Sequence, residues 1–204
     1  GILMKATTPA EDSGGNDQFF EQSAEVLLTS IIYLIHYYYP KESQNWSTFV
    51  KLLDATCVYT SKDGSIDNRA GGILDIAKKA QKFWKEEKHM ETDFPGYVAV
   101  EKYYNGAAET TSSIVASLDA HCRYMKLKCV IDLLSEDEIK IAKSFGYSKP
   151  CKEAPAGKRI LFIVTSEDKR YYDWIPSMVY SLYFDELYHL TAIDPNLHET
   201  LPQH

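Results

Sequence analysis

The chain has no excess of basic residues. Its 204 residues include 22 Lys and Arg against 29 Asp and Glu, which gives a net charge of −7. Proteins that read duplex DNA usually carry the opposite sign, because contacts to phosphates dominate their affinity. The acidic balance therefore argues against nonspecific nucleic-acid binding by the whole surface, and it fits a basic protein partner better.

Long apolar runs are also missing. The longest apolar-rich run, residues 26–39, has 14 residues and includes Thr29, Ser30 and His36. A helix needs roughly 20 apolar residues to cross a bilayer, so we expect no membrane span and no membrane contact in this chain.

Cysteines are few and are not closely paired. The four are Cys57, Cys122, Cys129 and Cys151, and none belongs to a CxxC motif. Because Cys57 and Cys129 lie in apolar-rich segments, we expect them to pack as small hydrophobic residues. With no signal peptide in view, the sequence indicates a reducing, cytoplasmic compartment.

The motifs of common nucleotide and hydrolytic sites are absent. The sequence contains no GxxxxGK[ST] loop and no GxGxxG, GxSxG or HExxH pattern. His121, Cys122 and Cys129 are residue types that bind zinc, but the two cysteines lie in an apolar helical pattern that favours core packing. We therefore expect no catalytic, cofactor-binding or metal-binding residue in this chain.

Apolar residues at helical spacing predict a helical bundle over residues 17–156, after a flexible leading segment at 1–16. The expected helices are 17–39, 46–55, 73–89, 97–104, 107–130 and 135–144. The clearest pattern has steps of three and four residues and predicts one long helix over 107–130. Its members are Thr111, Val115, Leu118, Cys122, Met125 and Cys129.

The last quarter of the sequence has a different character. Residues 160–164 form an uninterrupted apolar run, typical of a strand buried on both faces of a parallel sheet, and a helix containing Pro176 follows. No second strand of equal quality is found, and a lone strand leaves its backbone groups unpaired. The sequence thus predicts a mainly α chain, with a strand–helix unit at 157–192 from the sheet of a larger α/β protein and a tail at 193–204.

Three charged clusters are candidate sites. Glu136, Asp137 and Glu138 follow Ser135, a pattern that also marks a capped helix start. Ser166, Glu167, Asp168, Lys169 and Arg170 follow the carboxyl end of the predicted strand, where α/β proteins usually bind ligands. Lys78, Lys82 and Lys85 form a stripe beside aromatic residues, which can bind single-stranded nucleic acid. Since the aromatic residues fall on the inner face of that helix, a solvated stripe is favoured.

Four segments carry a family resemblance when taken in order. They are Phe19–Glu25 with the apolar run 26–34, then Asn45–Leu53, then Tyr103-Tyr104 with 108–114, and finally 157–168. Together they resemble the TraG-type coupling ATPases of type IV secretion systems, over residues 17 to 192. The resemblance implies an all-α domain inserted in a RecA-like motor domain, with one motor strand and helix attached.

The resemblance also implies a parent protein and partners. The parent would be a hexameric ATPase, anchored at the cytoplasmic face of the membrane, that uses ATP and Mg and feeds relaxase-bound single-stranded DNA to the transfer channel. The partners would be the relaxase and relaxosome accessory proteins. Both nucleotide motifs and the anchor are absent here, so we expect no ATPase activity and a monomeric state for this chain alone.

We therefore expect a non-catalytic substrate-receptor domain that docks the relaxosome in conjugative DNA transfer. Residues 136–138 are its candidate partner contacts, and residues 166–170 would face a neighbouring subunit or the channel in the parent. Two alternatives stay open. A small α/β enzyme built on the 160–164 strand would need a nucleophile–base pair or a phosphate loop, and a structural helical adaptor would bind no relaxosome partner.

Overall fold

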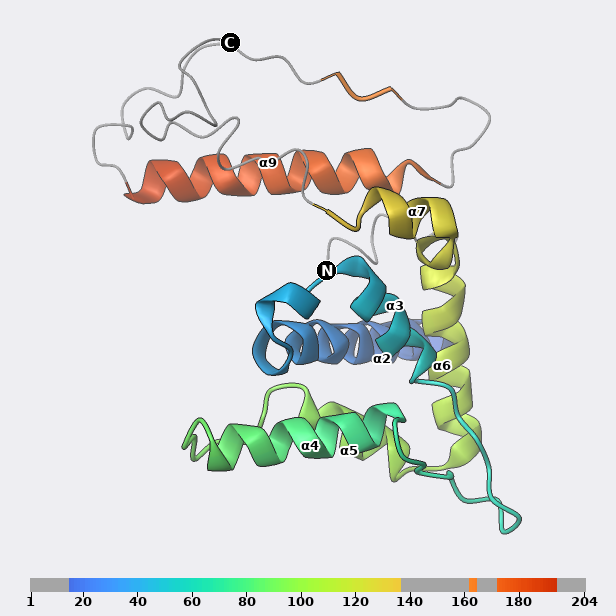
Figure 1. Cartoon of the computed structure of the whole chain (residues 1–204). Coiled ribbons are helices and arrows are strands. Elements are labelled where there is room, and N and C mark those ends of the chain that lie inside the picture. The colour runs from blue at the N-terminus through green and yellow to red at the C-terminus, as the bar shows by residue number, and fades with distance from the viewer. Residues whose placement is uncertain (1–14, 137–161, 165–171, 194–204) are drawn as a thin grey trace. The chain divides into compact units, whose positions relative to one another are not determined.

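The computed structural model describes residues 15–136, 162–164 and 172–193 (Figure 1). The described part is mainly helical and contains no strand beyond an isolated bridge, which confirms the mainly α class. The chain divides into two compact units, one of residues 9–136 and one of residues 1–8 and 137–204. Each unit is described by itself.

In its described residues, 15–136, the first unit contains six α-helices, with short segments of π- and 3-10 helix after α2 and α6. The α-helices are α2 (Gly15–Tyr33), α3 (Trp46–Asp54), α4 (Ile73–Glu86), α5 (Tyr97–Tyr104), α6 (Ala108–Cys122) and α7 (Lys128–Leu133). A π-helical turn, η1 (Leu34–Tyr38), extends α2, and the 3-10 turns are η2 (Lys41–Ser43) and η3 (Arg123–Lys126). The helices expected at 46–55 and 97–104 are confirmed, and that expected at 73–89 ends at Glu86.

Helix α2 is the centre of this unit. It packs against α3, α5 and α6, and α4 lies beside α5 (Figure 1). Its buried side chains are Ser23, Ala24, Leu27, Leu28, Ser30 and Ile31, and Leu34 of η1 is buried as well. Full burial of one Leu or Ile contributes about 1.5–3 kcal/mol, so this inner face is a main source of stability. Val26 and Ile32, which are also apolar, are exposed.

The prediction of a single long helix over 107–130 is wrong, because the helix breaks after Cys122. Tertiary contacts explain this break. The indole Nε1 of Trp46 donates a hydrogen bond of 3.0 Å to the carbonyl oxygen of Met125, which a continuous helix would have used internally. Leu127 takes an extended conformation with ψ 136°, and α7 then begins in a new direction. Met125 stays buried.

The break changes the surroundings of the cysteines. Cys122, at the end of α6, is buried as expected, and burial raises the pKa of its thiol to about 12. Cys129 lies beyond the break and is exposed, and so is Cys57 after α3. The prediction that Cys57 and Cys129 pack as core residues is therefore wrong.

A cluster of ion pairs lies at the end of α6, where the expected long helix breaks. Lys126 Nζ lies 2.7 Å from Asp119 Oδ1 of α6 and 3.1 Å from Asp54 Oδ1 of α3. Burial opposes the charge on Lys126, but hydrogen bonds to the two carboxylates outweigh it and raise the pKa. The cluster ties η3 to both helices at the place where the helical hydrogen bonding stops.

Helix α5 approaches α2 closely at Gly96. A Cβ atom built on Gly96 would lie 2.9 Å from the backbone oxygen of Ser30 and 3.1 Å from the Phe94 ring. The preceding segment is held by Gln81 of α4, which accepts from Phe94 N and donates to Asp93, both at 2.5 Å. Glycine at position 96 therefore sets the separation between α2 and α5.

The second unit contains one described helix, α9 (Trp174–Ile193), with Pro176 as its third residue, as the sequence predicts. Residues 162–164 have no regular secondary structure, and the side chains of Phe162 and Val164 are 81% and 93% exposed. The predicted buried strand is thus not seen in these three residues, and residues 160–161 lie outside the described part. No helix among the described residues combines the length and apolarity that crossing a membrane requires.

Substituting Gly96→Ala tests the close approach of α5 to α2. We expect the free energy of unfolding to fall by about 1–3 kcal/mol, because the new methyl group would overlap the backbone of Ser30. Urea denaturation followed by circular dichroism measures the change. The control is Val98→Ala, an exposed position on α5, which should alter stability by no more than about 0.5 kcal/mol. Equal stability of the Gly96→Ala variant and the wild type would contradict the packing described.

Candidate functional site

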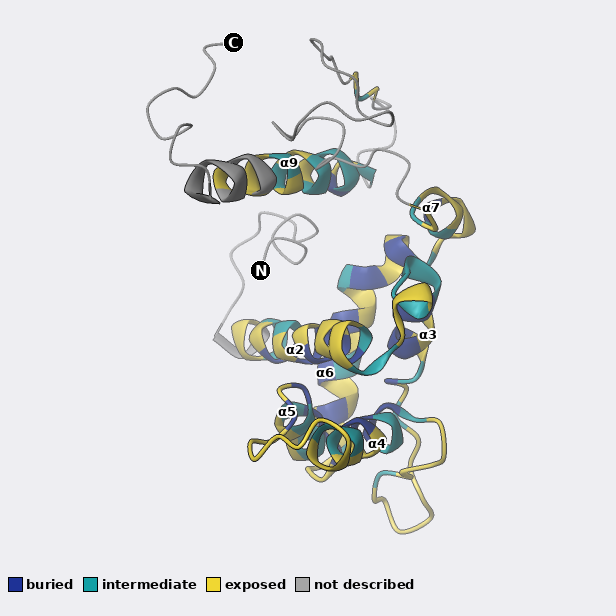
Figure 2. Ribbon diagram, turned by 60° about the vertical axis from the view of Figure 1, so that its left-hand side comes forward, coloured by how far each residue is buried: buried dark blue, intermediate teal, exposed yellow. Residues whose placement is uncertain are grey.

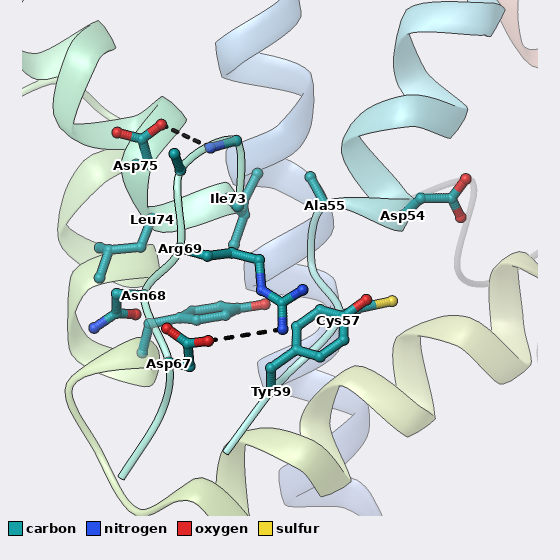
Figure 3. A pocket seen from close by; sticks show the side chains of 14 residues that line it. Asp54, Ala55, Cys57, Tyr59, Asp67, Asn68, Arg69, Ile73, Leu74 and Asp75 are labelled. Atoms are coloured by element: carbon teal, nitrogen blue, oxygen red, sulfur yellow. Dashed lines mark hydrogen bonds and ion pairs between the residues drawn. The ribbon is translucent and has the colours of Figure 1, made fainter. Parts of the chain in front are cut away.

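A surface cavity lies between the end of α3, the loop 55–72 and the start of α4 (Figure 3). Its volume is about 190 Å³. The polar side chains that line it include Asp54, Tyr59, Asp67, Arg69 and Asp75. The stretch 55–72 contains no helix.

The far end of the loop is a tight turn. Asp63 Oδ1 accepts hydrogen bonds from the backbone N (3.1 Å) and the hydroxyl (2.7 Å) of Ser65, and these bonds lower the pKa of Asp63. Gly64 has φ +83°, a conformation that favours glycine. A bridge between Thr60 and Ile66 closes the turn. The two arms of the loop are thereby brought side by side.

Arg69 from one arm stacks on Tyr59 from the other. The guanidinium carbon lies 3.2 Å from the centroid of the Tyr59 ring, a cation–π contact worth about 0.5–1 kcal/mol at an exposed site. An Arg69 Nη atom also lies 3.8 Å from Asp67 Oδ2 (Figure 3). The stack and the ion pair orient the arginine along one wall of the cavity.

The opposite wall is the start of α4. Gly71 has φ +82°, consistent with the turn expected at Gly71-Gly72, and its N–H donates to Asp75 Oδ2 at 2.9 Å (Figure 3). Lys79 Nζ lies 2.8 Å from the same oxygen. The hydrogen bond from Gly71 and the one from Lys79 lower the pKa of Asp75. The ionised carboxylate of Asp75 therefore holds the backbone in place where the chain enters α4.

Buried hydrogen bonds hold the inner side of the site. The hydroxyl of Tyr104 donates to the backbone oxygen of Thr56, and burial raises the pKa of this tyrosine. Ile73 N donates to Ala55 O at 2.9 Å, which joins the start of α4 to the end of α3. These hydrogen bonds hold the two ends of the loop 55–72 in place.

The size and charge of the cavity limit what it can bind. Small-molecule sites usually enclose about 300–1,000 Å³, so a volume of about 190 Å³ fits one side chain of a partner rather than a nucleotide. Asp54, Asp67 and Asp75 line it against a single guanidinium, that of Arg69. Each of these carboxylates is paired with a cation, Asp54 with Lys126, Asp67 with Arg69 and Asp75 with Lys79, so the charge of the lining gives no strong preference for a basic partner.

The sequence-predicted site residues that the structure describes, Glu136, Lys78, Lys82 and Lys85, do not line this cavity. Glu136 is exposed at the end of the described range 15–136, and Asp137 and Glu138 lie outside the described residues. The cluster Ser166, Glu167, Asp168, Lys169 and Arg170 also lies outside them. Lys78, Lys82 and Lys85 are exposed on α4, as predicted, while Lys82 lies 3.8 Å from Glu86 and Lys85 lies 2.8 Å from Asp93.

His121, Cys122 and Cys129 do not form a zinc site. His121 Nδ1 lies 2.8 Å from the carbonyl oxygen of Ser117, within its own helix. In the described parts of the chain, no three His, Cys, Asp or Glu side chains gather as metal ligands would. Comparisons with protein-family models, curated proteins and solved structures give no match to this chain.

The cavity could not be predicted from the sequence, because the residues that contact each other lie on opposite sides of a turn. Tyr59 and Arg69 are ten residues apart, and neither belongs to a recognised motif. The one available signal was Lys62-Asp63-Gly64-Ser65, a turn sequence that brings the residues on its two sides together.

Substituting Asp75→Asn tests the electrostatic role of this carboxylate. The pKa of Asp75 is lowered in the folded state, so its stabilising effect is present above the unfolded value of about 3.9 and is lost as the pH falls through the folded pKa. We expect the variant to have a lower urea midpoint at pH 7 and the wild-type advantage to disappear at about pH 2.

Glu91→Gln, at an exposed loop position, is the matched control and should follow the wild type at both pH values. An advantage of wild type over Asp75→Asn that persists unchanged at low pH would show that the charge of Asp75 is not responsible.

Proposed function

We propose that the chain is a partner-docking helical domain of a TraG-type coupling ATPase, non-catalytic on its own, which receives the relaxase and its accessory proteins in conjugative DNA transfer. The parent in this proposal is a hexameric ATPase with ATP and Mg, anchored at the cytoplasmic face of the membrane. The proposal rests on the four sequence segments that resemble this family.

The supporting observation is that two of these segments contain residues that join the helices. In the second segment, Asn45 accepts from Thr48 N at 3.0 Å and caps α3, while Trp46 donates to Met125 O. In the third, Tyr104 donates to Thr56 O, and Thr111 Oγ1 donates to Tyr103 O at 2.5 Å. The first segment, residues 19–34, runs along α2 to the first residue of η1. A sequence pattern at such joints is what a shared helical fold requires.

Charge supports a docking role. The chain carries −7 overall, and the lining of the cavity contains three carboxylates and one guanidinium. A DNA-processing protein such as a relaxase is expected to be basic, and complementary charge speeds its encounter with an acidic receptor. Glu136, Asp137 and Glu138 remain the proposed partner contacts.

The last part of the chain has a separate place in the proposal. Residues 160–164 would pair within the motor sheet of the parent, and 166–170 would face a neighbouring subunit or the channel. The exposure of Phe162 and Val164 supports this, because large exposed apolar side chains close together in the chain mark a surface that another element covers.

A binding measurement tests the proposal. Isothermal titration of the chain with the relaxase from the same conjugative element should give a dissociation constant of about tens of micromolar or tighter, as expected for a transient interface. The variant E136Q/D137N/E138Q should bind several-fold more weakly and with a smaller salt dependence. The matched control E86Q/E87Q/E91Q, which removes three exposed acids elsewhere, should bind like the wild type.

Absence of relaxase binding at about 100 μM would contradict the docking role and favour a structural adaptor. Turnover of a nucleotide by the purified chain would contradict it in favour of an enzyme. If E136Q/D137N/E138Q binds the relaxase as tightly as the wild type, these three residues are not its contacts.

A further inference from the structure

The break between α6 and α7 has no cause in the local sequence. Helix α6 ends at Cys122, and α7, which starts at Lys128, does not continue its axis (Figure 2). Sharp breaks in helices usually occur at proline, at glycine or where a side chain is inserted between the turns. Residues 107–136 contain no proline, and they contain no glycine. Arg, Met, Lys and Leu, which make up most of residues 123–127, are among the strongest helix formers. The local sequence therefore favours a continuous α-helix at the place where the structure has none.

Contacts from outside the segment account for the break. The indole Nε1 of Trp46 donates to the carbonyl oxygen of Met125, the acceptor that the N–H of Cys129 would use in a continuous helix. An indole group thus stands in the place of a helical hydrogen bond.

The ion pairs of Lys126 also belong to the broken form. Lys126 Nζ lies 2.7 Å from Asp119 Oδ1 and 3.1 Å from Asp54 Oδ1. In a continuous helix, Asp119 and Lys126 would be seven residues and about 10.5 Å apart along the axis. Side chains on one helix meet at spacings of three or four residues, so the pair with Asp119 requires the break.

A straight helix would keep the buried face of α6. Leu118, Cys122 and Met125 are buried, and the spacing of three and four residues that places them on one face continues to Cys129. In a helix that runs through this segment, Met125 would stay on the same side as Leu118 and Cys122. The two forms therefore share the contacts of α6 with the core, and they differ mainly in the contacts of Trp46 and Lys126.

We propose that residues 123–127 are a conformational switch: the contacts of Trp46 and Lys126 hold the broken form, and their release joins α6 and α7 in one straight helix. Single hydrogen bonds and exposed ion pairs each make small net contributions, so a few such contacts decide between the two forms. An equilibrium of this kind is shifted by anything that favours one form. The inference goes beyond the docking role proposed above and does not depend on it.

The switch is linked to the cavity through Asp54. This carboxylate lines the cavity, and its ion-pair partner is Lys126 of η3. Release of Lys126 leaves Asp54 without that cation, so the cavity is more acidic in the straight form. By reciprocity, a cation that binds Asp54 in place of Lys126 favours the straight form.

A distance measurement in the full chain tests the switch. Nitroxide labels are attached after Ser112→Cys on α6 and Asp132→Cys on α7, two exposed positions, and double electron–electron resonance gives the distribution of distances between them. In a straight helix these positions are 20 residues apart, about 30 Å along the axis. Buried Cys122 is kept, and the remaining cysteines are replaced by serine in every sample: Cys57, Cys129 and Cys151.

Two variants release the break. Trp46→Phe keeps a ring beside Phe49 but lacks the indole N–H, and it should raise the fraction of molecules at the straight-helix distance about fivefold or more. Asp54→Asn, at an exposed position, weakens the hold on Lys126 and should raise that fraction about twofold or more.

A third variant locks the broken form. Lys128 is the first residue of α7 and follows Leu127, which is extended with φ −66° and ψ 136°. Proline fits this position, because it is favoured at the first position of a helix and after an extended residue. In a straight helix, the same proline would clash with the preceding turn. W46F/K128P should therefore lose the straight-helix distance, and the matched control W46F/K128A should keep it.

Distributions of Trp46→Phe and Asp54→Asn equal to that of the wild type would overturn the proposal. A straight-helix population in W46F/K128P as large as in W46F/K128A would also overturn it, because no helix can run through a proline at residue 128 without distortion. Thermal melts check that each variant is folded, and Asp54→Asn decides the matter if Trp46→Phe is not. Absence of relaxase binding would contradict the docking role and leave these distances as predicted, so the two proposals fail separately.

Discussion

The burial of one face of α2 is the interaction on which the rest of the helical unit depends. Leu27, Ile31 and Leu34 are fully buried, and the helices that cover them come from before and after the long loop. Three such side chains together contribute about 5–9 kcal/mol on transfer from water, which is comparable to the whole net stability of a domain. Helix α2 is therefore the element that α3, α5 and α6 share.

Periodicity in the sequence was sufficient to predict most helices, since it reports directly which side chains share a face. It failed where distant contacts decide the structure. The break after α6 depends on Trp46 donating to Met125 O, a contact across 79 residues that no local pattern contains. Cys129 was assigned to the core for the same reason, because its spacing continues the α6 pattern beyond the point at which the helix ends.

The sites were less predictable than the fold. The cavity depends on the stacking of Arg69 on Tyr59 and on the bond from Gly71 to Asp75, and these are details of loop geometry rather than of composition. The apolar residues of α2 were visible in the sequence. Deciding which of them are exposed required knowledge of which neighbours cover α2, because Val26 and Leu27 are adjacent and equally apolar. The acidic character of the chain was readable from composition alone.

The most direct test of this account compares two variants at adjacent positions of α2, Leu27→Ala and Val26→Ala, by urea denaturation. The account predicts that Leu27→Ala lowers the free energy of unfolding by about 2–5 kcal/mol, because Leu27 is fully buried, and that Val26→Ala lowers it by no more than about 1 kcal/mol, because Val26 is exposed. Equal losses of stability in the two variants would contradict it.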